Sequence, residues 1–291
     1  MGRTPILLLI ALLGIMSTAG CASKPHIVVG SKNFTEQLLL GEIVAQQIER
    51  RLGIEVERKF DLGGTLLAHE ALKSGDIDLY PEYTGTALTA ILKRAPVRDA
   101  KTAFGIVSQG YRQWGIEWLP PLGFNNSFAM VVRSELARAD GLKTLSDAAR
   151  RPAAWRMGVG YEFTQRPDGL HGLVQTYGLR LEGDPVTMDL GLLYPALQSK
   201  KIDMAAASAT DGMLAHSEFT VLDDDLHYFP PYECAIAVRH DSLERFPRLR
   251  GALTELSGHI SDTDMRRMNE LVDVEHKRAA DVARDFLKSG K

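Results

Sequence analysis

Cysteine is nearly absent from this chain of 291 residues, which contains only Cys21 and Cys234. Two cysteines so far apart do not indicate a disulfide scaffold or a cysteine-rich zinc site. The eight histidines are scattered, and no two stand four residues apart as on a zinc-binding helix. Because Cys234 lies in an apolar run, we predict a small core residue there, and we expect neither a metal nor a cofactor.

Signatures of catalysis and of nucleic-acid binding are also missing. The sequence contains no Walker A motif, no GxGxxG and no GxSxG. Its 34 basic and 37 acidic residues are interspersed and give a net charge of −3, which argues against nucleic acid as a partner. We therefore predict a protein that is not an enzyme, although a triad assembled from distant residues would leave no motif.

Long hydrophobic runs are limited to the start of the chain. Residues 1–20 combine an early arginine, a short apolar core and small residues, which is typical of an export signal rather than a membrane span. Small residues leading into Cys21 resemble a bacterial lipobox, which predicts a lipidated cysteine and a tether over 21–25. A plain secretory signal is the alternative. We expect an exported, membrane-anchored protein that faces the periplasm or the cell exterior.

The remaining chain alternates strand and helix patterns. A β-branched run over 26–30, a helical pattern up to Gly53, and a second strand over 54–60 open a parallel α/β unit. We predict two lobes, one built from 26–126 plus 233–291 and the other from 127–232. Each would be a mainly parallel sheet flanked by helices. Two crossings between lobes make a clamshell that can close on a ligand by hinge motion.

The stretch Asp76–Thr86 marks the predicted ligand-binding edge. Its first half alternates polar and apolar residues, as a half-buried strand does, and its second half holds Pro, Gly, Tyr and Thr before an apolar run. This pattern predicts a strand-to-helix turn with a threonine at the N-cap. Ligands of open α/β sheets bind beside such turns. A buried tyrosine in an ordinary loop is the alternative for Tyr83.

Several other predicted loops place polar and aromatic side chains at the same edge. Cations and a hydroxyl suit an anionic group, and aromatic rings without a neighbouring carboxylate cluster suit a quaternary ammonium, which has no N–H to donate. Each residue alone has an ordinary structural explanation, and the argument rests on their joint placement. The residues are Lys32, Tyr83, Thr86, Asn126, Phe128, Arg166 and Tyr232.

Long motifs along the chain resemble one known family. Residues 29–37 (VGSKNFTEQ), 62–65 (LGGT) and 80–86 (YPEYTGT) look like the osmoprotectant-binding proteins of ABC importers. The resemblance continues through 166–169 (RPDG), 209–212 (ATDG), 230–232 (PPY) and the tail, where it includes Met265 and Asn269. It implies a type II periplasmic-binding-protein fold, no catalysis, and delivery of glycine betaine, choline or a related compound to a permease with a separate ATPase.

Matching motifs also imply roles for individual residues. Lys32, Thr86 and Arg166 would hold the ligand carboxylate, and Tyr83 and Tyr232 would form two walls of an aromatic cage. The sequence departs from the family at three further positions. Phe128 keeps a ring but lacks the usual hydroxyl, Ser208 replaces a frequent tyrosine, and Asn126 stands where some members have an acidic residue. The cage is therefore incomplete.

Three hypotheses follow from this resemblance and its gaps. The first is a monomeric lipoprotein that captures a quaternary-ammonium zwitterion such as glycine betaine for an ABC permease. The second keeps the importer role but takes a larger or less cationic zwitterion, using the room at Ser208. The third is a sensor or an enzyme on the same clamshell.

Overall fold

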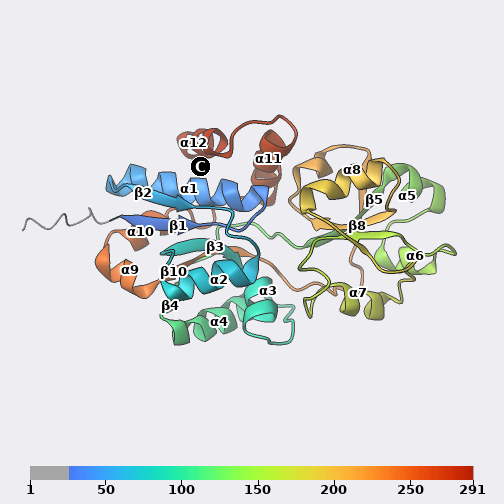
Figure 1. The fold of residues 1–291 in the computed structure, drawn as a ribbon, viewed down its shortest axis with the longest axis horizontal. Helices are drawn as coiled ribbons and strands as arrows, with labels where there is room; N and C mark the ends of the chain where they lie inside the picture. The colour runs from blue at the N-terminus through green and yellow to red at the C-terminus, as the bar shows by residue number, and fades with distance from the viewer. Residues whose placement is uncertain (1–25, 291) are drawn as a thin grey trace, which may run out of the picture.

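The computed structural model describes residues 26–290, and they form two lobes that lie side by side along the long axis (Figure 1). Each lobe is a five-stranded sheet with helices packed against it. The predicted signal, the tether and Cys21 lie outside the described residues. Among residues 26–290, no helix is both long enough and apolar enough to cross a membrane.

The first sheet has the strand order β2-β1-β3-β10-β4. Its strands come from two separate parts of the chain: β1 Ile27–Gly30, β2 Val56–Lys59, β3 Leu79–Tyr83, β4 Ile116–Trp118 and β10 Cys234–Arg239. The second sheet has the order β7-β6-β8-β5-β9 and uses one continuous part of the chain. Its strands are β5 Phe128–Arg133, β6 Met157–Val159, β7 Val186–Thr187, β8 Met204–Ser208 and β9 Phe219–Leu222.

One strand of each sheet runs against the other four. In the first sheet β10 pairs antiparallel with β3 and β4, whereas β1 pairs parallel with β2 and β3. In the second sheet β5 is antiparallel to β8 and β9, and β6 is parallel to β7 and β8. Both exceptional strands begin just after the chain has crossed from one lobe to the other. The prediction of mainly parallel sheets in a clamshell is confirmed.

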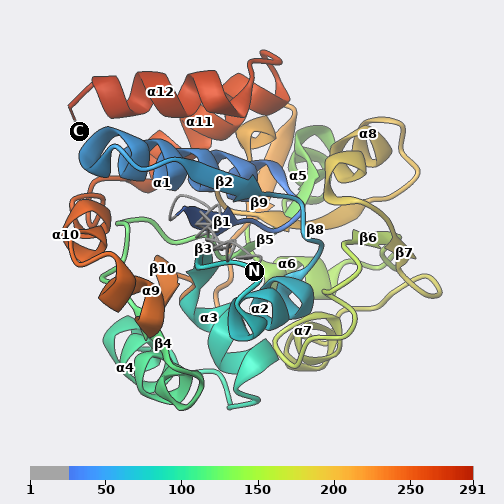
Figure 2. The same cartoon turned by 60° about the vertical axis from the view of Figure 1, so that its left-hand side comes forward.

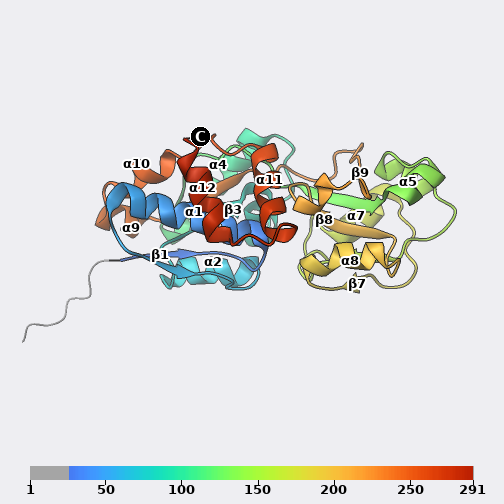
Figure 3. The same cartoon turned by 90° about the horizontal axis from the view of Figure 1, so that it is seen from above.

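Helices cover both faces of the first sheet (Figures 1 and 2). In this lobe they are α1 Thr35–Leu52, α2 Thr65–Ser74, α3 Thr84–Thr86, α4 Ala100–Tyr111, α9 His240–Arg245, α10 Leu249–Thr254, α11 Asp262–Asp273 and α12 Ala279–Lys288. The second lobe has α5 Ser134–Asp140, α6 Leu145–Arg150, α7 Leu170–Tyr177 and α8 Leu193–Gln198. Seen from above, α11 lies beside the junction of the lobes (Figure 3).

Alternation along the central strands divides the core between the two faces of each sheet. On β10, Cys234, Ile236 and Val238 pack in one buried cluster, and Ala235 and Ala237 pack in another. Successive side chains of a strand point to opposite faces, so a fully buried strand serves two layers. Cys234 is a free thiol with no exposed surface, and burial raises its pKa well above the usual value. It is the core residue that we predicted.

The predicted strand at Asp76 begins later than expected. Strand β3 starts at Leu79, and the carboxylate of Asp78 instead accepts hydrogen bonds from the Val28 N–H and the Ser242 hydroxyl. The expected threonine N-cap is also wrong, because Tyr83 precedes the first helical residue and makes no side-chain cap. The Thr84 hydroxyl donates to the Pro231 carbonyl, so it ties this turn to the second crossing.

The strand ranges place the crossings at residues 119–127 and 223–233, between β4 and β5 and between β9 and β10. The lobe boundaries at 126/127 and 232/233 stay a prediction. Loops that leave β1, β3, β6 and β8 meet between the lobes, and there they line a large cavity.

Candidate functional site

A cavity of about 860 Å³ lies between the lobes. All eight residues predicted to bind ligand line it: Lys32, Tyr83, Thr86, Asn126, Phe128, Arg166, Ser208 and Tyr232. The structure therefore brings together side chains that are up to 200 positions apart. The contacts that they make with one another differ from the predicted roles in several places.

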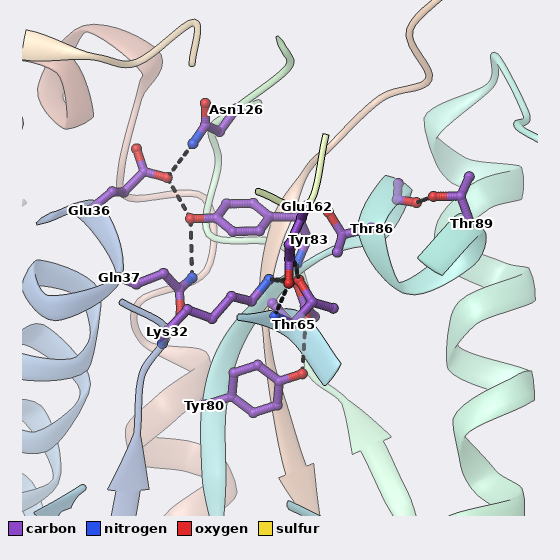
Figure 4. Close-up of polar contacts among 12 residues, drawn as sticks. Lys32, Glu36, Gln37, Thr65, Tyr80, Tyr83, Thr86, Thr89, Asn126 and Glu162 are labelled. Atoms are coloured by element: carbon purple, nitrogen blue, oxygen red, sulfur yellow. Dashed lines mark hydrogen bonds and ion pairs between the residues drawn. The ribbon is translucent and has the colours of Figure 1, made fainter. Parts of the chain in front are cut away.

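Tyr83 is held rigidly at the end of β3. Its hydroxyl donates to the Glu36 carboxylate at 2.6 Å and accepts from the Gln37 amide at 3.1 Å (Figure 4). Only 4% of its surface is exposed, and its ring stacks near Phe34 with centroids 6.4 Å apart. Burial and the neighbouring Glu36 charge raise its pKa well above the usual value, so the ring is a neutral hydrogen-bonding wall.

Glu36, in the first turn of α1, is a buried carboxylate that receives four hydrogen bonds. Tyr83 and the Asn126 amide donate to one oxygen, the latter at 2.7 Å. The Thr210 hydroxyl and the Asn269 amide donate to the other at 2.5 and 3.1 Å. Burial raises the pKa of Glu36, although these four hydrogen bonds act in the opposite direction. No lysine or arginine of the described residues forms an ion pair with it.

Lys32 does not present a free ammonium to the cavity. Its Nζ lies 2.5 Å from a Glu82 oxygen and 3.2 Å from the Thr65 hydroxyl, and 5.0 Å from the centroid of the Tyr83 ring. Glu82 has no exposed surface and also accepts a hydrogen bond from the Tyr80 hydroxyl. The Lys32 charge is thus already balanced within the first lobe.

Arg166 reaches from the second lobe to the first. Its Nε and Nη2 bind the two oxygens of Asp168 at 3.0 and 2.6 Å, and its Nη1 donates to the Thr86 hydroxyl at 3.1 Å. Burial acts to lower the pKa of Arg166, but the charge and hydrogen bonds of Asp168 together with the neighbouring Tyr232 and Glu162 outweigh it, and the pKa lies above its usual value. The guanidinium stays charged, and two of its N–H groups face Asp168.

Two aromatic rings lie beside this guanidinium, and a third packs against one of them. Phe128 and Tyr232 meet edge to face with centroids 5.5 Å apart, and Phe128 meets Phe163 at 4.8 Å. The Arg166 Cζ lies 5.3 Å from the Phe128 centroid and 5.8 Å from that of Tyr232. Such an arrangement fixes the rings through quadrupole and cation–π attraction. A Cβ at Gly85 would lie 2.6 Å from Tyr232, so a glycine allows the ring to approach.

Ser208 is the direct cross-strand partner of Phe128 in the β5–β8 pairing. The side chains of such a pair stand side by side on one face, so a tyrosine at 208 would extend the aromatic wall. Serine leaves this part of the cavity open. The next turn carries Asp211, which accepts from the Tyr194 hydroxyl at 2.9 Å and from the Ser208 N–H at 3.1 Å.

Carboxylates are numerous around the cavity, so the expectation of rings without a carboxylate cluster is wrong. Glu36, Asp211, Asp273 and Glu162 all line it. Loss of solvent around its carboxylate, together with the charges of Glu36 and Asp273, raises the pKa of Asp211 to about 7. The two cations that line the cavity, Lys32 and Arg166, are each paired with another carboxylate. The electrostatic potential of the cavity wall is therefore negative, which favours a ligand with positive charge.

The side chain of Glu162, from the second lobe, contacts the start of α2 in the first lobe. Its carboxylate accepts from the Thr65 N–H at 2.6 Å and from the Thr65 hydroxyl at 3.0 Å. A carboxylate at a helix N-terminus is favoured by the free N–H groups and by the helix dipole. A Cβ on Gly64 would come within 2.1 Å of this carboxylate, so the contact requires a glycine at that position.

Glu36, Thr210, Asn269, Glu162 and Asp168 are the site residues that sequence reasoning missed. All five lie in stretches that carry the family resemblance, Glu162 in the pair Glu162-Phe163, but none belongs to a recognisable local signature. Glu36 looks like an ordinary acidic residue in the first turn of a helix. Only the fold shows that four donors from distant segments meet at its carboxylate.

Comparison with known proteins identifies the family. The model of the substrate-binding domain of ABC-type glycine betaine transport systems, OpuAC, matches residues 25–289. The chain belongs to the OpuAC family. Members are substrate-binding transport proteins of glycine betaine and carnitine importers, not enzymes, and they act outside the cytoplasm.

Individual relatives and solved structures agree with this assignment. The chain is 34% identical over 280 residues to a glycine-betaine-binding protein of Pseudomonas aeruginosa, covering 93% of this chain and 89% of the relative. It is 33% identical over 284 residues to the ergothioneine transport permease/ergothioneine binding protein EgtU of Helicobacter pylori, covering 97% of this chain but only 50% of that relative. A solved glycine betaine/carnitine/choline ABC transporter structure superposes with a TM-score of 0.76 at 32% identity, covering 90% of this chain and 98% of the other. The type II periplasmic-binding-protein fold is thus confirmed.

Proposed function

We propose that this OpuAC-family protein captures a small quaternary-ammonium zwitterion of the glycine betaine class between its lobes. It would then deliver the ligand to an ABC permease driven by a separate ATPase. The observation that carries this proposal is the separation of charge preferences across the cavity. Glu36 and Thr86 lie on opposite sides of Tyr83 (Figure 4). Hydrogen-bond donors remain unused around Thr86, whereas Asp211 and Asp273 line the cavity near Glu36.

The Thr86 side suits a carboxylate. Within residues 26–290, the Thr86 hydroxyl accepts from Arg166 but donates to no protein acceptor, and the second N–H of Nη1 is also uncommitted. A charged guanidinium N–H and a hydroxyl are strong partners for a carboxylate oxygen. We assign this role to Thr86 and Arg166. Lys32 would contribute only through its position beside the site, since its charge is balanced by Glu82.

The Glu36 side suits a cation. Only neutral groups donate hydrogen bonds to the Glu36 carboxylate, and no cation of the described residues is paired with it. The rings of Tyr83, Phe128 and Tyr232 supply apolar surface whose faces attract a cation. A methylated ammonium gains roughly 0.5–2 kcal/mol from each well-placed ring. Asn126 and Ser208 would complete the ligand-binding wall.

The remaining parts of the proposal concern the whole molecule. The lobes, divided at 126/127 and 232/233, would close around the ligand as a monomer. The chain would be exported and held to the membrane by lipid on Cys21. Replacing Cys21 with alanine should then release the protein from the membrane fraction, and unchanged membrane association would contradict the anchor.

A larger zwitterion is the second candidate, and the size of the cavity favours it. About 860 Å³ is in the upper part of the ~300–1,000 Å³ range of pockets for drug-sized ligands, and glycine betaine is much smaller. The relative named for ergothioneine shows that one homologue has been assigned a bulkier cargo. Ser208→Tyr separates the two candidates, since it should tighten betaine binding if the site is a loosely filled betaine cage.

Calorimetric titration of the full chain in mild detergent tests the main proposal. Glycine betaine, choline and carnitine are the ligands, and native mass spectrometry of the freshly purified protein looks for a retained one. We expect saturable binding of at least one ligand. No heat from any of them at millimolar concentration would overturn the proposed ligand class.

A further inference from the structure

Four large apolar side chains stand at the mouth of the cavity. Leu66 and Leu67 belong to the first turn of α2 in the first lobe, and Tyr161 and Leu190 follow β6 and β7 in the second. All four line the cavity, yet between 43% and 63% of the surface of each is exposed. Arg166, at the inner end, is only 7% exposed. The cavity therefore has a buried polar end and an exposed apolar end, and we call these four residues the apolar rim.

The two leucines of the rim that face each other's lobe each pack against a glycine. A Cβ on Gly63 would lie 2.7 Å from a methyl group of Leu67, and one on Gly160 would lie 2.6 Å from a methyl group of Leu190. Gly63 also has a φ of 96°, which favours glycine. Each leucine thus lies directly on the backbone beside the cavity, where any larger residue would displace it. The rim is a defined surface of the fold.

Clustering at one opening indicates that the rim is covered when the site is occupied. Among residues 26–290, eight large hydrophobic side chains are exposed, and four of them form the rim. Single exposed leucines are ordinary on a protein surface, whereas a group of them beside a cavity marks a binding surface. Glycine betaine held at Thr86 and Tyr83 is much smaller than a cavity of about 860 Å³, and it would leave the rim in contact with water.

We propose that the apolar rim binds an apolar substituent of the cargo, a short alkyl, acyl or aryl group joined to the zwitterion at the inner end. The rim lines the same cavity as Thr86 and Arg166, so one molecule can reach both. This continuity favours a ligand over a macromolecular partner as the occupant. The inference rests on the proposed function and keeps its quaternary ammonium and carboxylate. It adds the group that fills the outer part of the cavity and contacts both lobes.

Matched ligand pairs that differ by one short apolar chain test this substituent site. The pairs are glycine betaine with N-butyl-N,N-dimethylglycine, and carnitine with O-butanoylcarnitine, titrated calorimetrically into the full chain in mild detergent. Full burial of one methylene group gives about a fourfold gain in affinity. Because the rim is half exposed, we expect the chain-bearing member of at least one pair to bind about tenfold more tightly. N-(2-methoxyethyl)-N,N-dimethylglycine, which has a polar chain of the same length as butyl, should gain less than threefold.

A gain below about threefold in both pairs would overturn the inference and leave the proposed function standing, with the rim assigned to a macromolecular partner. Binding of none of these ligands would overturn both.

Variants show whether the rim causes the gain. In Leu67→Ser/Leu190→Ser, which removes apolar surface from both lobes, the gain should fall from about tenfold to within about threefold. Leu192→Ser is the matched control, because Leu192 is an exposed leucine on the same short 3₁₀ helix, Leu190–Leu192, but does not line the cavity. It should keep the wild-type gain.

The gain is a ratio of two affinities measured on one protein, so a general loss of affinity does not change it. Comparison between variants in the same detergent also cancels any partition of the chain into micelles, and thermal unfolding verifies that each variant is folded. A wild-type gain in Leu67→Ser/Leu190→Ser, or an equal loss of the gain in Leu192→Ser, would contradict the assignment.

Discussion

At the scale of single residues, the site is governed by which charges are already paired inside the protein. Lys32 and Arg166 look equivalent in the sequence, as two cations near a predicted ligand. In the structure Lys32 is neutralised by the fully buried Glu82, whereas Arg166 keeps an N–H for a ligand beside Thr86. A cation motif therefore says little about binding until its partner is known.

Substitution of Lys32 should therefore act mainly on stability. Lys32→Met leaves the Glu82 carboxylate buried without its cation, which we expect to lower the free energy of unfolding by about 3–5 kcal/mol. In Lys32→Met/Glu82→Gln the buried charge is gone, and at least half of that loss should return. Urea unfolding of the three proteins measures this. A Lys32→Met protein as stable as the wild type would mean that the ion pair is unimportant.

Asp211 should make the stability of the unliganded protein depend on pH. Its pKa is raised to about 7 in the folded state, from an ordinary value near 3.8. Between these values the folded protein keeps a proton that the unfolded chain has lost. The contribution of Asp211 to stability is therefore largest below about pH 4 and is lost as pH rises through about 7. Glu36, whose pKa is also raised, adds to the same trend.

The comparison of wild type with Asp211→Asn isolates this contribution. The variant should lose less stability than the wild type between pH 5 and pH 8, as measured by urea unfolding at several pH values. Tyr194 faces the Asp211 carboxylate with a neutral hydroxyl throughout this range. A constant difference between the two proteins across the range would show that Asp211 does not titrate there.

At the scale of secondary-structure elements, the contact between Glu162 and the start of α2 joins the two lobes. Gly64→Ala places a Cβ 2.1 Å from the present position of the Glu162 oxygen, so the side chain must withdraw. We expect ligand affinity to fall about threefold to tenfold with little change in stability, since the lost charge-assisted contacts join the two lobes and lie outside the core of either one.

The control for this change is Gly105→Ala on α4, where a Cβ meets no atom within 4 Å. It should leave affinity unchanged. Glu162→Gln should weaken ligand binding to a similar extent as Gly64→Ala. The double variant should bind ligand as tightly as the single variant with the lower affinity, because both substitutions remove the same contact. Fully additive losses would assign separate roles to the two residues.

Elements with a strong local pattern were predictable from the sequence. The β-branched run of β1 and the end of α1 at Gly53, which adopts the left-handed conformation with φ of 66°, both lie where they were expected. The start of β3 was misplaced because Asp76 and Asp78 alternate with apolar residues as in a strand. Their carboxylates instead accept hydrogen bonds from groups outside β3, and the strand begins only at Leu79. Local periodicity does not reveal such tertiary partners.

The candidate site was predictable where one residue type implies a contact, as with the rings of Tyr83 and Tyr232. It was not predictable where the property belongs to a group. The environment of Glu36 depends on Asn126, Thr210 and Asn269, which are contributed by a crossing, a turn and a helix far along the chain. Their meeting depends on how the two lobes are placed against each other, which no local pattern records.

At the scale of the whole molecule, two α/β lobes bring unused hydrogen-bond donors and acidic side chains to opposite sides of one cavity. Neither lobe supplies a complete site, since Thr86 comes from the first and Arg166 from the second, and they meet across the cavity. A ligand with both charges can thus contact both lobes at once, and its binding favours the closed form over the open one.

The most direct test of this account is the affinity of wild type and Thr86→Val for glycine betaine and for choline, which lacks the carboxylate. We predict that the wild type binds betaine about tenfold more tightly than choline, as expected for a charge-assisted contact. Thr86→Val should abolish most of this preference and leave the affinity for choline within about threefold of the wild type. An unchanged preference in the variant, or a wild type that does not distinguish the two ligands, would contradict the claim that the cavity binds both ends of a zwitterion.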